Sequence, residues 1–122
     1  MPDLLTIAAV SGGRRYAWGD EDTALFEMLV RFLGLEEIWH GGAFGVDAAI
    51  DLHARRLGLG VRTFLPQPVL LPSELPRALL ARTAEMIDEL DHKIHREGHR
   101  GGVLIWPGAE GTDFAAGHAR RR

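Results

Sequence analysis

The sequence predicts a single α/β domain over residues 1–122, of the Rossmann-like three-layer type, with a mostly parallel sheet of four or five strands. Four short apolar segments alternate with longer segments of helical periodicity, a pattern typical of parallel strands with helices on the faces of the sheet. Glycine-rich turns follow three of these four segments. The length of 122 residues fits one domain of ordinary size.

The first half of the chain predicts two strands and two helices. An apolar strand over residues 4–10 ends at a glycine turn, and a helix with Asp20 and Asp22 as candidate N-caps then runs to Gly34. The apolar residues of this helix are spaced as one buried stripe, which consists of Leu25, Phe26, Leu29, Phe32 and Leu33. A second strand over residues 37–40 and a second helix over 46–57 complete this half.

The second half predicts two further strands around a long helix. Residues 61–65 form the third strand, and a proline-rich loop leads to Ser73, the expected cap of a helix that ends near Glu89. We expect residues 91–102 to be a polar insertion with a break at Gly101 and Gly102. A fourth strand over 103–106 then precedes the last glycine-rich loop and a short final helix.

The composition excludes several classes of function. The absence of cysteine removes disulfides, thiolate metal sites and cysteine nucleophiles. A net charge of −3 argues against general nucleic-acid binding, although all but one of the 14 basic residues are arginines, whose planar fork suits phosphate. No apolar run is long enough to cross a bilayer and no signal peptide is recognisable, so we expect a cytoplasmic protein without membrane contact.

The three glycine-rich loops form the strongest candidate site. They cover residues 11–16, 40–47 and 107–112, and each is expected to leave the carboxyl end of a strand at the same edge of the sheet. Glycine lets backbone amides approach a phosphate, and a following helix directs its positive end to the same place. One such loop alone is equally well explained as a tight turn, but three together favour a shared anion or nucleotide site. Neither the dinucleotide fingerprint nor the triphosphate P-loop is present.

These loops carry a family resemblance. Gly-Gly-Arg-x-Tyr at 12–16, His-Gly-Gly-Ala-x-Gly-x-Asp at 40–47 and Pro-Gly-x-x-Gly-Thr at 107–112 together resemble the Rossmann-like SLOG superfamily. That superfamily includes the LOG phosphoribohydrolases, the DNA-processing DprA proteins and a YpsA-like branch of small bacterial and phage proteins, to which this chain is most similar. The resemblance implies a nucleotide-like ligand held by Ser11, Gly12, Gly13, Arg14, Tyr16, His40, Gly41, Gly42, Ala43, Gly45, Asp47, Arg82, Pro107, Gly108, Gly111 and Thr112.

Arg82 and Asp113 decide between binding and catalysis. Arg82 to Met86 resembles the Arg-x-x-x-Met element of the LOG enzymes, whose arginine takes part in cleaving a glycosidic bond. The glutamates that those enzymes carry after the last motif are replaced here by Phe and Ala, and Asp113 would point elsewhere on the helix. We therefore expect a binding protein that acts as a sensor, carrier or sequestering protein. The alternatives are an N-glycosidase acting on nucleoside monophosphates and, with less support, a DNA-binding accessory domain.

Several other residues leave alternatives open. His92, His95 and His99 are spaced like metal ligands, but an exposed polar insertion explains them better, and we predict neither a metal nor a cofactor. His40 either contacts the ligand or closes its turn. Tyr16 and Trp18 either stack on a base or cover the first loop. The apolar helix faces, and the dimers common among related proteins, also leave a homodimer open.

Overall fold

The computed structural model of this chain describes residues 4–106, and the expected last loop and last helix lie outside that range. Strands and helices alternate along the described chain. In order, the elements are β1 (Thr6–Ser11), α1 (Asp20–Leu33), β2 (Glu37–His40), α2 (Val46–Arg56), β3 (Gly60–Thr63), a 3₁₀ turn (Pro72–Glu74), α3 (Leu75–His95) and β4 (Arg100–Ile105).

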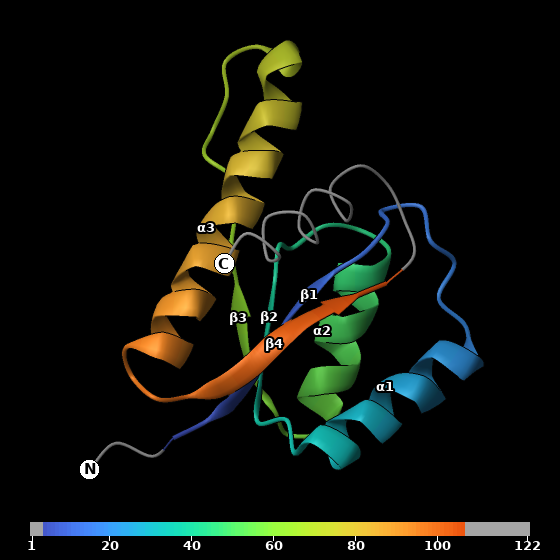
Figure 1. Cartoon of the computed structure of the whole chain (residues 1–122). Coiled ribbons are helices and arrows are strands. Elements are labelled where there is room, and N and C mark those ends of the chain that lie inside the picture. Colours follow the sequence, from blue (N-terminus) through green and yellow to red (C-terminus); the bar gives the residue numbers. More distant parts are fainter. Residues whose placement is uncertain (1–3, 107–122) are drawn as a thin grey trace.

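The four strands form one parallel sheet in the order β3-β2-β1-β4. Helices α1 and α2 lie on one side of this sheet and α3 lies on the other, so the predicted three-layer α/β class is confirmed (Figure 1). The strands β2 and β4 lie on opposite sides of β1, so the direction in which the chain adds strands to the sheet reverses at β1. In open α/β sheets such a reversal opens a crevice at the carboxyl ends of the central strands, where ligands bind.

Side chains alternate across the sheet into two cores, as expected for strands covered on both faces. The core beneath α1 and α2 is built around Phe26, Ile38 and Ile50. The core beneath α3 contains Trp39 and Met86. All five side chains are almost completely buried, so the central strands are held from both sides.

The predicted buried stripe of α1 is wrong in part. Only Phe26 is buried, with Leu29 partly covered, whereas Leu25, Phe32 and Leu33 are exposed. The predicted caps of this helix also change. Gly19 is the N-cap residue, and Asp22 in the first turn accepts a hydrogen bond from the Gly19 N–H at 2.9 Å. The C-terminal end is as predicted, with Gly34 in the left-handed conformation at φ 65°.

The second half of the chain corrects three boundaries. Ser73 does not cap α3, because it lies within the 3₁₀ turn and the helix begins at Leu75. The helix continues beyond Glu89 to His95, since Leu90 extends its buried face. Gly101 and Gly102 do not break the chain but lie inside β4.

The glycine at position 101 has a packing reason. A Cβ atom there would overlap the Ile7 carbonyl oxygen of the neighbouring strand β1.

None of the helices between residues 4 and 106 is long and apolar enough to cross a membrane.

Candidate functional site

The candidate site lies where the adjacent strands β1 and β2 end. The loop after β1 (residues 12–19, the first loop) and the loop after β2 (residues 41–45, the second loop) touch at the start of α2. The Val46 N–H donates to the Gly13 carbonyl oxygen at 3.3 Å. Gly45 fits beside this bond only because it lacks a side chain, since a Cβ atom would overlap the carbonyl oxygens of Gly13 and Arg14.

The second loop uses its backbone N–H groups internally. The N–H groups of Gly41 and Ala43 donate to Oδ2 of Asp47 at 3.1 and 3.2 Å. The N–H of Gly42 donates to Nδ1 of His40 at 2.9 Å. These three donors therefore fix the shape of the loop and are already paired within the protein.

The first loop differs in this respect. The N–H groups of Gly12, Gly13 and Arg14 have no hydrogen-bond acceptor within residues 4–106. The Arg14 side chain is exposed, and the neighbouring helix α2 begins without a side-chain cap. Amides that lack an acceptor in the described chain, a cation and the N-terminus of a helix all favour an anion at this point.

Tyr16 and Trp18 cover the first loop. The Tyr16 hydroxyl donates to Asp22 at 2.7 Å, and the Trp18 indole N–H donates to Thr23 at 2.8 Å. Trp18 also packs against Trp106 with ring centroids 5.1 Å apart. Both rings are thus hydrogen-bonded to side chains at the start of α1, which favours the covering role over stacking on a base.

Arg82 reaches the second loop from α3, on the other side of the sheet. Its side chain is buried, and Nη1 donates to the Gly41 carbonyl oxygen, while Nε has no partner within the described chain. Gly41 makes room for this contact, because a Cβ atom there would overlap the guanidinium group. Burial lowers the pKa of Arg82, and the nearby charge of Arg14 lowers it further.

Asp47 is the acidic counterpart of Arg82. The carboxyl group is buried, and this burial raises its pKa although the two loop amides and the charges of His40 and Arg82 favour ionisation. One of its oxygens, Oδ1, has no partner among residues 4–106. Asp47 and Arg82 therefore hold the second loop between them from two different helices.

His40 closes the turn after β2, one of the two roles considered for it. Because Nδ1 accepts the Gly42 N–H, we assign the ring proton to Nε2, which lies 2.6 Å from Oδ2 of Asp51. The other Asp51 oxygen accepts a hydrogen bond from Nε of Arg55 at 2.6 Å. This bond is the main reason that the pKa of Asp51 is lowered, and His40 contributes to the same effect.

Eleven of the predicted ligand residues lie together at this edge of the sheet, and Tyr16 covers the loop beside them. The eleven are Ser11, Gly12, Gly13, Arg14, His40, Gly41, Gly42, Ala43, Gly45, Asp47 and Arg82. Pro107, Gly108, Gly111, Thr112 and Asp113 fall outside the described residues. Sequence reasoning missed Asp51, although its i,i+4 spacing to Arg55 on a helix was a visible signal.

The described residues contain no cluster of His, Asp and Glu that could hold a metal ion. Within the predicted histidine insertion, His92 and His95 belong to the last turn of α3, whereas His99 accepts the Leu5 N–H at 2.9 Å.

No family model, curated protein or solved structure matches the chain. The SLOG resemblance therefore rests on the sequence motifs alone, namely the three loops and the element from Arg82 to Met86.

Proposed function

We propose that this protein binds a nucleotide or nucleotide-derived small molecule, and that the phosphate of this ligand contacts the first loop. The observation that carries the proposal is the cationic surroundings of that loop. Exposed Arg14 and buried Arg82 lie close enough for their charges to interact, beside three amides that have no acceptor within residues 4–106 and a helix start that has no side-chain cap. Among residues 4–106, Asp47 is the acidic group that acts on Arg82, and it is buried.

The ligand class follows from chemistry together with the resemblance. Amide groups at a helix start and an arginine fork are suited to the oxygens of a phosphate group. The likeness to the SLOG superfamily adds a nucleotide base and ribose to that phosphate. We propose the role of a sensor, carrier or sequestering protein in preference to that of an enzyme, because Arg82 is engaged by the Gly41 carbonyl and holds the second loop.

Titration calorimetry with a panel of nucleoside monophosphates and their phosphate-free nucleosides tests the proposal. We expect the monophosphates to bind more tightly, and Arg14→Ala to weaken the binding of phosphate compounds by about 5- to 30-fold, the range of one charge-assisted hydrogen bond. Arg15→Ala is the matched control, since Arg15 is an exposed neighbour that does not act on Arg82. Equal affinity for nucleosides with and without phosphate would contradict the proposal.

A chromatographic assay for released base separates binding from N-glycosidase activity. General acid–base help from one group is worth about 10²- to 10⁴-fold, so a site without its carboxylate is expected to release no more than a trace of base. Turnover that is lost in both Arg82→Ala and Asp113→Asn would replace the binding proposal with the enzymatic one. Because Arg82 also supports the second loop, the circular dichroism of its variant must be checked alongside.

A further inference from the structure

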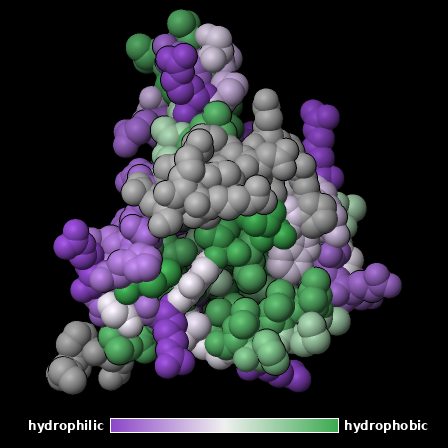
Figure 2. Space-filling model, in the orientation of Figure 1, coloured by the Kyte–Doolittle hydropathy of each residue, from purple (hydrophilic) through white to green (hydrophobic). Residues whose placement is uncertain are grey.

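Helix α1 carries an apolar stripe on its outer side. Leu25, Met28 and Phe32 follow an i, i+3, i+7 spacing and are 43%, 56% and 82% exposed. Phe26, the buried residue of this helix, points the other way into the core. Figure 2 shows the hydrophobic side chains gathered over α1 on the face of the molecule that also carries β4. An amphipathic helix of a monomer usually turns charged residues outward at such positions.

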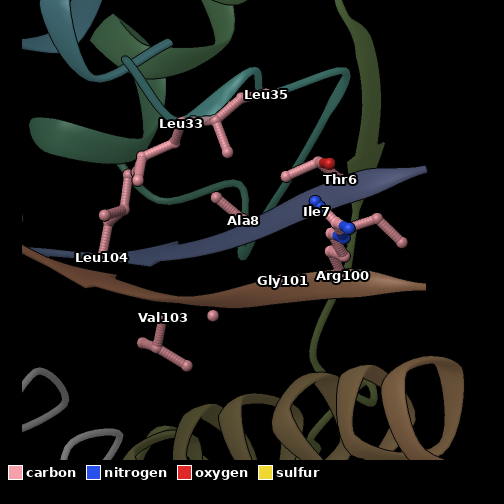
Figure 3. Close-up of a pocket in the computed structure, with 10 residues that line it drawn as sticks. Thr6, Ile7, Ala8, Leu33, Leu35, Arg100, Gly101, Val103 and Leu104 are labelled. Carbon is pink, nitrogen blue, oxygen red and sulfur yellow. The ribbon is translucent and has the colours of Figure 1, made fainter. Parts of the chain in front are cut away.

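An apolar groove of about 380 Å³ opens beside the end of this helix. Leu33, Leu35 and Leu104 converge on one side of β1 and β4, with Ala8 beneath them (Figure 3). Gly102 leaves the groove open, because a Cβ atom at this position would have no atom within 4 Å. In the described sheet β4 is an edge strand, so no neighbouring strand lies outside the groove.

We propose that this face is an interface between two copies of the chain, in which Phe32 of each copy enters the groove of the other. A two-fold interface uses the same patch on both copies, so the patch must carry both a protrusion and a recess. Here Phe32 is the protrusion, and its neighbour Leu33 already forms part of the recess. The stripe and the groove thus form one continuous, self-complementary surface.

The size of the surface and its place in the fold favour a second copy as the occupant. The exposed parts of Leu25, Met28, Phe32 and Leu33 sum to on the order of 400 Å² per copy, and two copies with their groove linings approach the ~1,000 Å² of a specific interface. The groove lies beside the edge strand β4, so a second copy can approach it without displacing another strand of the described sheet.

Sedimentation velocity of the full chain over a range of concentrations tests this interface. We expect a concentration-dependent dimer whose dissociation constant rises at least ~10-fold in Phe32→Glu, which removes the protrusion. Gly102→Leu fills the recess from within each copy, where space is free, and should weaken the dimer similarly. Leu70→Glu is the control, because Leu70 is 97% exposed and lies outside both the stripe and the groove.

Each other result overturns the proposal. A monomer at the highest soluble concentration would show that no second copy binds there, whether the groove stays open or residues 107–122 cover it. A dimer that neither substitution weakens would place the contact on another face. Circular dichroism of each variant verifies folding, and the two substitutions act on different elements, so a folding defect in one leaves the other informative.

Discussion

The two glycine-rich loops at the carboxyl edge use their backbone amides in opposite ways. In the second loop, all three N–H groups from Gly41 to Ala43 are bonded to side chains of the protein itself. In the first loop, the N–H groups of Gly12 and Gly13 have no acceptor within residues 4–106. The second loop is therefore held by side chains of the protein itself, and the first loop is the one to which we assign the phosphate of the ligand.

The comparison also separates two uses of glycine. Gly41 and Gly45 are required because other groups of the protein occupy the space of a side chain, namely the Arg82 guanidinium and the carbonyls of the first loop. Glycine in a loop of this kind is usually interpreted as room for a phosphate. Here the glycines of the second loop make room for the protein, and the position of the first loop depends on them.

Gly45→Ala should have the largest effect on stability. Its φ of 74° is unfavourable for alanine, and the new methyl group would overlap two backbone carbonyls of the first loop. We expect a loss of about 3 to 5 kcal/mol in the free energy of unfolding, measured by urea denaturation. Gly58→Ala is the matched control, because Gly58 has a similar φ of 78° and no atom near its Cβ position.

The control variant should lose only the cost of the backbone conformation, about 1 kcal/mol. Equal losses in the two variants would mean that the contact between the loops contributes nothing. In that case the second loop could not be the support of the first.

Asp47→Ala should have the next largest effect. The substitution removes the acceptor of two loop amides and the counter-charge of buried Arg82. Leaving two donors without a partner is expected to cost about 2 to 4 kcal/mol. Hydrogen exchange should then become faster at Gly41 and Ala43. Unchanged exchange at both positions would contradict the supporting role of the second loop.

The carboxyl groups of Asp47 and Asp51 should make the free energy of unfolding depend on pH in opposite directions. These effects should be smaller than those of the substitutions above. Burial raises the pKa of Asp47, so its contribution to stability is present below the unfolded pKa and is lost as the pH rises through the folded pKa. The bond from Arg55 lowers the pKa of Asp51, so its contribution is present above the unfolded pKa and is lost as the pH falls through the folded value.

Urea denaturation between about pH 3 and pH 7 therefore distinguishes Asp47→Asn from Asp51→Asn. Relative to the wild type, Asp47→Asn should become more stable as the pH rises above about 4. Asp51→Asn should become less stable than the wild type as the pH rises through the region below about 4, where the wild-type carboxyl group ionises. Parallel profiles for the two variants would contradict the difference in environment between the buried and the half-exposed carboxyl group.

Periodicity and glycine positions were sufficient to predict the α/β class and the order of the elements. They failed where tertiary packing decides burial. Phe32 and Leu33 fit the apolar spacing of α1, but a helix beside an edge strand covers only part of its stripe. The sequence predicts a break at Gly101 and Gly102, because it does not show that β1 passes close to Gly101.

The place of the site was also predictable, but the direction of its hydrogen bonds was not. The alternation of strands and helices predicts that the glycine-rich loops share one edge of the sheet, and the first and second loops do meet there. Whether Asp47 turns inward to the second loop depends on backbone angles that the motif does not specify. The inward position of Arg82 follows from the packing of α3 across the sheet, which the local sequence also leaves open.

Amide NMR during titration with a nucleoside monophosphate tests directly whether the ligand contacts the first loop. We expect the largest changes in chemical shift at the N–H groups of Gly12, Gly13 and Arg14. The N–H groups of Gly41 and Ala43 should change little, because Asp47 already binds them. Large changes confined to the second loop, or no saturable change in either loop, would contradict a ligand contact at the first loop.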